Sequence, residues 1–78
     1  MQRNTRYNTF QKALINARQK TGLTQQEVAL RLERTQSFVS KYESGERRLD
    51  VIEFVEVCQA LGIMPQSILK QLGKADDK

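Results

Sequence analysis

Apolar residues recur every three or four positions along most of this chain, which is the spacing of one face of an α-helix. No stretch alternates apolar and polar residues in the way that is typical of a half-buried strand. A glycine follows most apolar segments, as expected of residues that end helices in the left-handed conformation. These glycines are Gly22, Gly45, Gly62 and Gly73. The pattern predicts an all-α fold, a compact bundle of about five short helices.

Residues that favour helix starts stand at the matching positions. Thr24 and Asp50 are each followed three residues later by a glutamate, so each is expected to begin a helix with a capping box. Thr35 is a further N-cap candidate, and Pro65 suits the first turn of a last helix. The segments delimited in this way are residues 10–21, 24–32, 35–44, 50–61 and 65–72.

The fourth segment, residues 51–61, is apolar over a wide arc, whereas a surface helix shows a narrower stripe. Two interpretations stay open: this helix packs on several sides within the bundle, or part of it faces another subunit. The first is favoured because a central helix has enough neighbours to cover it. Cys58 lies within this run, so a buried structural thiol is favoured over a reactive one.

The chain of 78 residues is expected to form one domain, residues 1–78, with a basic arm at 1–6 and a polar tail at 73–78. It contains no histidine and one cysteine, which removes the commonest general base and the commonest metal ligands. We therefore expect no enzyme activity, no metal site and no cofactor. Neither a signal peptide nor a run of about 20 apolar residues is visible, so a cytoplasmic protein without a membrane partner is expected.

Positive charge is concentrated in the N-terminal two-thirds of the chain. Residues 1–48 hold ten lysines and arginines against four acidic residues, a net charge of +6. Residues 49–78 hold three against five, a net charge of −2. This asymmetry fits a polyanionic partner for one face of the molecule. Taken alone, it fits an ordinary solvated surface equally well.

The spacing from Thr24 to Gly45 is the most informative part of the sequence. Two predicted helices of about eight residues are joined only by Glu33 and Arg34 before the Thr35 cap. Such a short connection makes the helices cross steeply, and the small side chain of Ala29 allows their backbones to approach. A pair of this kind can lay its first helix across a phosphate backbone and insert its second into the major groove.

The stretches ARQKTGLTQQEVA (residues 17–29) and QSFVSKYESGER (residues 36–47) resemble the Cro/C1-type, lambda-repressor-like helix-turn-helix proteins of the XRE family. The resemblance covers roughly residues 10–72. Two positions depart from the family pattern, because Glu33 replaces the usual glycine of the turn and Arg34 replaces an apolar residue. A left-handed Glu33 would be strained by about 1 kcal/mol. The resemblance implies a regulator of transcription, a repressor being the expected form, that binds double-stranded DNA.

The resemblance also implies which side chains face DNA. Those expected to contact bases from the second helix of the motif are Gln36, Ser37, Phe38, Ser40 and Lys41. Gln36 can pair with adenine, Lys41 can donate to guanine, and Phe38 can pack on a thymine methyl group. For Phe38 the alternative is that its side chain folds back into the core.

Phosphate contacts need only donors, and four residues are expected to supply them: Gln25, Arg34, Arg47 and Arg48. Lys41 is a further candidate, as are Arg3 and Arg6 on the N-terminal arm. The family resemblance implies one structural pair, in which Arg18 of the first helix meets Glu43 at the end of the recognition helix and orients it.

A homodimer on a two-fold operator is expected, because one such domain contacts about half a site. The candidate dimer surface is Ile68, Leu69 and Leu72 together with part of the fourth helix. Ordinary core closure by the last helix is an equally good explanation of these three residues. The alternative function is a protein-interaction module, such as an antitoxin or an adaptor. It would bind its partner through the extra apolar residues of the fourth helix.

Overall fold

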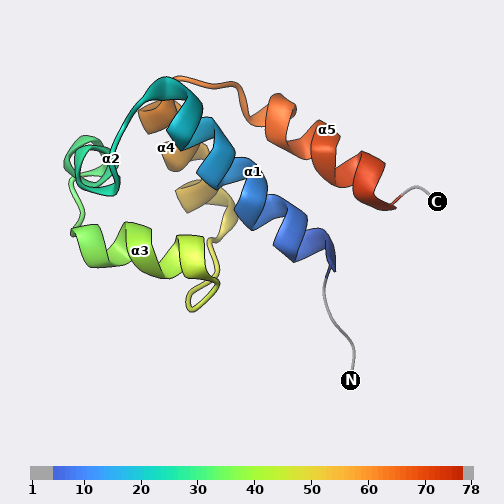
Figure 1. Ribbon diagram of the computed structural model, residues 1–78, viewed down its shortest axis with the longest axis horizontal. Helices are drawn as coiled ribbons and strands as arrows, with labels where there is room; N and C mark the ends of the chain where they lie inside the picture. The colour runs from blue at the N-terminus through green and yellow to red at the C-terminus, as the bar shows by residue number, and fades with distance from the viewer. Residues whose placement is uncertain (1–4, 77–78) are drawn as a thin grey trace.

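The structure, a computed structural model, describes residues 5–76, which form five α-helices and no strand. The helices are α1 (Thr5–Thr21), α2 (Gln25–Leu32), α3 (Gln36–Ser44), α4 (Val51–Leu61) and α5 (Pro65–Asp76). Figure 1 shows α5 running alongside α1 in the opposite direction, with α2 and α3 together at the other side of the bundle and α4 behind α1. The predicted all-α bundle of five short helices is confirmed.

The helix starts lie where the capping residues predict them. The hydroxyl of Thr24 accepts from the Glu27 amide at 3.1 Å, and the Thr24 amide donates to the Glu27 carboxylate at 2.8 Å. Asp50 forms the same reciprocal pair of bonds with Glu53, at 2.7 and 3.0 Å. Thr35 caps α3 by accepting from an amide three residues on, as expected. Each cap satisfies amides that the first helical turn leaves without an intrahelical partner.

The two ends of the bundle differ from the expected arm and tail. Helix α1 begins at Thr5, so Arg6 is helical and not part of an arm, while Arg3 lies outside the described residues. The ring of Tyr7 packs 5.3 Å from that of Phe10, which extends the apolar face of α1 toward its start. Gly73 does not end α5, which continues to Asp76, since a helix tolerates an internal glycine at a cost of about 1 kcal/mol.

Helix α4 supplies more of the core than any other helix. Its buried residues are Phe54, Val57, Cys58, Ala60 and Leu61, whereas Val51 and Ile52 at its start are exposed. The predicted burial of Cys58 is confirmed, and burial raises the pKa of its thiol to about 11. The side chain of Ile68 is only 1% exposed because α5 packs it against the core, so its assignment to a dimer surface is wrong.

Within residues 5–76, no single helix has both the length and the hydropathy needed to cross a membrane. Helix α4 and residues 65–73 meet that test only as a pair, by length and composition, and they are bent by 118°.

Candidate nucleic-acid interface

The turn between α2 and α3 is closed by a left-handed residue that is not glycine. Glu33 has φ 59° and ψ 42°, as anticipated for the position at which the family usually has glycine. Its amide donates to the carbonyl of Leu30 at 3.1 Å, and the next amide, of Arg34, donates to Ala29 at 2.9 Å. These two bonds satisfy two of the last four carbonyls of α2, where the chain turns toward the Thr35 cap. The short connection therefore holds two packed helices in one fixed relation.

Helix α3 presents a polar face to solvent. Four of the five side chains expected to contact bases are exposed on it: Gln36, Ser37, Ser40 and Lys41. Val39 and Tyr42 are buried on its opposite face and anchor the helix to the core. Packing of the opposite side on the core therefore fixes the exposed face of α3, which offers hydrogen-bond donors and acceptors to solvent.

Phe38 does not belong to that face. Its side chain is 9% exposed and its ring lies 5.5 Å from the ring of Tyr42, edge to face. The guanidinium carbons of Arg34 and Arg47 lie 4.3 and 4.9 Å from the ring centroid, within the range of cation–π attraction. The prediction that Phe38 projects toward a thymine is therefore wrong, because two arginines cover its ring.

A hollow of about 470 Å³ opens beside the start of α3. It is lined by Glu33, Arg34, Thr35, Ser37, Phe38, Lys41 and Arg47. The fold thus brings two of the arginines expected at phosphates next to three of the residues expected at bases, Ser37, Phe38 and Lys41. Arg48 lies apart from this hollow, with its guanidinium 4.2 Å from the ring of Tyr7.

The carboxylate of Glu53 on α4 contacts both arginines of the hollow, Arg34 and Arg47. Its two carboxylate oxygens accept from Nη1 and Nη2 of Arg47 at 3.0 and 2.9 Å, and Arg34 Nη2 lies 3.6 Å from Oε2. Because Arg47 and the Asp50 amide both donate to this carboxylate, the pKa of Glu53 falls to about 2. Glu53 therefore stays charged throughout the physiological range of pH.

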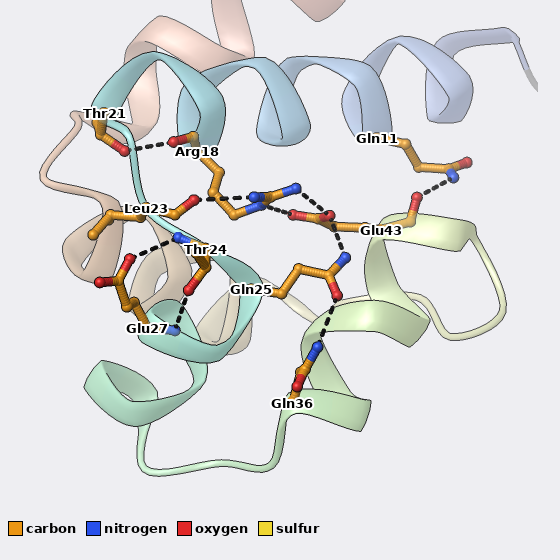
Figure 2. A network of polar contacts seen from close by, with 9 residues as sticks. All are labelled: Gln11, Arg18, Thr21, Leu23, Thr24, Gln25, Glu27, Gln36 and Glu43. Carbon is orange, nitrogen blue, oxygen red and sulfur yellow. Dashed lines mark hydrogen bonds and ion pairs between the residues drawn. The ribbon is translucent and has the colours of Figure 1, made fainter.

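Figure 2 shows a polar network that joins α1, α2 and α3 around a second carboxylate. Nε and Nη2 of Arg18 donate to the carboxylate of Glu43 at 2.8 and 3.2 Å, so the expected ion pair is present. Arg18 Nη1 also donates to the Leu23 carbonyl at 3.0 Å, and Gln25 Nε2 donates to Glu43 Oε1 at 2.9 Å. Gln11 donates to the backbone carbonyl of Glu43 at 3.1 Å.

Comparison with known proteins places this arrangement in a family. A helix-turn-helix family model matches residues 14–68, which include α2, α3 and the turn between them. The chain belongs to the XRE-type helix-turn-helix family. Its members bind DNA and regulate transcription, and this chain is a DNA-binding protein of that class.

Two solved structures show how closely this XRE-type chain keeps the family fold. An XRE-family like protein from Pseudomonas syringae pv. tomato str. DC3000 is 49% identical over 92% of this chain and 88% of its own, with a TM-score of 0.88. The clp gene regulator ClgR from C. glutamicum is 22% identical over 94% of this chain and 95% of its own, with a TM-score of 0.82, and shares the fold. No curated protein sequence matches this chain.

In this XRE-type domain the exposed face of α3 is connected to the buried ion pair through Gln25. Gln36 Nε2 lies 3.5 Å from Gln25 Oε1, a long hydrogen bond, while the Gln25 amide nitrogen is held by Glu43. The expected partner of Gln25 was a phosphate alone, and its link to α3 was not anticipated. No spacing rule connects Gln25 of α2 with Gln36 and Glu43 of α3, because these side chains meet only after the two helices have packed.

Glu53 is the residue of the interface that sequence reasoning missed. Its position three residues after Asp50 indicated a capping box, and that function is present, but nothing in the spacing indicated its contact with Arg47. Within residues 5–76, no group of three or more histidine, cysteine, aspartate or glutamate side chains could hold a metal ion.

Proposed function

We propose that this protein is a sequence-specific repressor of transcription that places α3 in the major groove of double-stranded DNA. The observation that supports this most directly is the exposed polar face of α3. The opposite face of α3 packs on the core, and the turn before the helix is closed by two backbone hydrogen bonds. A groove of B-DNA admits one α-helix, and exposed amide, hydroxyl and ammonium groups can distinguish the edges of base pairs there. Occupation of an operator by such a domain excludes other proteins from the same DNA.

The base contacts are assigned to Gln36, Ser37, Ser40 and Lys41. Gln36 presents an amide that pairs with adenine N6 and N7, and Lys41 donates to guanine O6 or N7. The Gln25 contact favours one orientation of the Gln36 amide before DNA arrives, which lowers the entropy lost on binding.

The phosphate contacts are assigned to Gln25, Arg34, Arg47 and Arg48. Gln25 is the first residue of α2, where free amides and the helix dipole favour an anion. Arg34 and Arg47 line the hollow beside α3, and Arg48 follows directly in the chain. Contacts of this kind supply affinity and fix the register of a protein on the duplex, but they do not themselves read a base.

The protein acts as a homodimer in this proposal. An apolar groove of about 250 Å³ lies between the start of α1, the start of α4 and the end of α5. Phe10, Phe54 and Leu72 line it, and the exposed side chains of Val51 and Leu69 stand at its edge. A second copy that covers this groove would bury those side chains and pair two recognition helices across a two-fold axis.

Selection of bound duplexes from a random pool tests this function. A common motif is expected, palindromic if a dimer binds, with an affinity that falls steeply as salt rises. Lys41→Ala is expected to relax the preference at one base position, whereas Arg47→Ala weakens binding to all sequences. Absence of DNA binding even at low salt would overturn the proposal and favour a protein-interaction module such as an antitoxin or adaptor.

A further inference from the structure

The guanidinium group of Arg47 can bind an anion through either of two pairs of N–H donors, and Glu53 already occupies one of these pairs. A guanidinium group offers five N–H donors that form an end-on fork from Nη1 and Nη2 and a side-on fork from Nε and Nη2. Glu53 accepts from the end-on fork, at 3.0 Å from Nη1 and 2.9 Å from Nη2. Arg47 Nη1 also donates to the carbonyl of Arg48 at 3.2 Å, which uses its second hydrogen.

The side-on fork of Arg47 has no partner among the residues that the structure describes. Its two donors are the Nε–H and the remaining Nη2–H, and 42% of the side chain is exposed. A fork of this shape matches two oxygens of one phosphate. Arg47 lines the hollow beside α3, next to Ser37 and Lys41, so a phosphate bound there would lie beside the recognition helix.

The carboxylate that holds the end-on fork is itself anchored. The side chain of Glu53 is only 12% exposed, and its Oε1 accepts from the Asp50 amide at 3.0 Å as part of the α4 capping box. Through Glu53, the guanidinium of Arg47 is therefore held at a fixed place relative to the backbone of α4. The contact of its guanidinium with the ring of Phe38, 4.9 Å away, restricts its plane further.

The charges around the hollow leave an excess for a phosphate. Arg34, Lys41 and Arg47 contribute three positive charges, against the carboxylates of Glu53 and Glu33. Glu53 cancels part of the attraction, so its contribution to binding would lie in geometry and not in net charge. An arginine that is already ordered loses less side-chain entropy when it binds.

We propose that Glu53 is a positioning residue for DNA binding, which holds the end-on fork of Arg47 so that the side-on fork receives one DNA phosphate in a fixed place. The proposal rests on the proposed function of α3. Because phosphate contacts set the register of a protein on the duplex, a misplaced Arg47 harms the operator complex more than a loosely registered non-specific one. Glu53 thereby supports sequence preference without touching a base.

The test is Glu53→Gln, with Glu56→Gln as its matched control. Both changes remove one negative charge from α4, and Glu56 is an exposed residue that lies outside the hollow. Glutamine keeps an oxygen for the Asp50 amide but cannot accept from both nitrogens of Arg47. Affinities are measured for an operator obtained by selection and for an unrelated duplex of the same length, at one salt concentration.

Both variants are expected to bind the unrelated duplex slightly more tightly, since each gains a positive unit of net charge. In Glu53→Gln, the ratio of operator to unrelated affinity is expected to fall about tenfold, the effect of one lost charge-assisted contact. In Glu56→Gln the ratio stays at the wild-type value. An unchanged ratio in Glu53→Gln would overturn the positioning proposal and leave Glu53 as a helix cap alone.

A second variant, Arg47→Lys, tests the same proposal if Glu53→Gln does not fold. Lysine keeps the charge but has a single donor group, so it cannot hold Glu53 and a phosphate with two separate forks. The affinity ratio is expected to fall about tenfold here too, while non-specific affinity is retained. Wild-type ratios in this variant would also refute the proposal. If the wild-type protein binds no duplex at low salt, the proposed function fails instead.

Discussion

Glu33 adopts a backbone conformation in which an L side chain is crowded by the carbonyl oxygen of its own peptide unit. Glycine at this position has no Cβ and adopts the same φ of 59° freely. We expect Glu33→Gly to raise the free energy of unfolding by roughly 0.5–1 kcal/mol, the relieved strain less the greater chain entropy of unfolded glycine. Urea denaturation followed by circular dichroism measures this difference.

Glu33→Ala is the control for that prediction. It removes the same charge but keeps a Cβ, so it should leave the left-handed strain in place. Equal stabilisation by alanine and glycine would show that the carboxylate, and not the backbone, is the source of the effect.

The carboxylate of Glu53 makes stability depend on pH in acid. Its pKa is lowered from 4.5 to about 2 in the folded protein, so the unfolded chain binds a proton more readily than the native one. The stabilisation is therefore complete above about pH 5 and is lost as the pH falls from about 4.5 toward 2. We expect the urea midpoint to fall more between pH 6 and pH 3 for the wild type than for Glu53→Gln. The same fall in both proteins would contradict this origin.

Phe38 shows where residue-level prediction from sequence ends. Phe38 was expected to contact a base, with folding back into the core as the alternative, and its side chain is buried beside Val39 and Tyr42. Its burial depends on Arg34 and Arg47, which come from outside α3 and meet over the ring only in the folded protein. A cation–π contact between separate segments leaves no periodic pattern in the chain.

At the scale of the elements, the helix starts were predictable because caps are local. Each cap residue and the amide that it satisfies lie within three residues, so the sequence alone contains the whole interaction. The outer ends of α1 and α5 were not predictable in this way. Near the start of α1 the ring of Tyr7 packs on that of Phe10, while Gly73 lies inside α5 and does not end it.

Helix α3 is held against α1 by the pair of Arg18 and Glu43. Glu43 is 7% exposed, so removing Arg18 leaves a nearly buried carboxylate whose one remaining side-chain partner, within residues 5–76, is the amide of Gln25. Breaking such a pair typically costs 3–5 kcal/mol, and with the remaining amide we expect Arg18→Ala to cost about 3 kcal/mol. It should also weaken binding to every duplex alike, because a misplaced α3 affects all sequences. Urea denaturation and DNA titration measure the two effects.

The double variant Arg18→Met, Glu43→Leu separates pairing from packing. With both charges gone no buried charge is left unpaired, so this variant should lose less stability than Arg18→Ala alone. Unchanged stability and DNA binding in Arg18→Ala would refute the assignment of this pair to the orientation of α3.

At the scale of the whole molecule, two surfaces have different chemistry. The exposed face of α3 and the hollow beside it are polar and basic, whereas the groove between α1, α4 and α5 is apolar. The resemblance to the helix-turn-helix family indicated the first surface, whereas the charge asymmetry of the sequence fitted an ordinary solvated surface equally well. The second could be predicted only in part, because the same apolar residues serve core and interface: Ile68 closes the core, while Leu69 is half exposed.

The proposed dimer is tested by placing a charge in the apolar groove. The side chain of Leu69 is 51% exposed at the edge of the groove, and that of Leu30 on α2 is 71% exposed outside it, so Leu69→Lys and Leu30→Lys form a matched pair. A buried, unpaired ammonium disfavours association, and we expect Leu69→Lys to raise the dimer dissociation constant at least about tenfold. Leu30→Lys should leave that constant unchanged. Sedimentation equilibrium measures it.

DNA titration of Leu69→Lys separates loss of the dimer from the effect of the added charge, because the two change the affinity for the operator in opposite directions. Added positive charge strengthens attraction to DNA at fixed salt, so Leu69→Lys should bind a single half-site at least as tightly as the wild type. Its affinity for the palindromic operator should nevertheless fall, because two domains that no longer associate lose the gain from linked binding. If both affinities rise together in Leu69→Lys and Leu30→Lys, the groove is not the surface on which two copies meet.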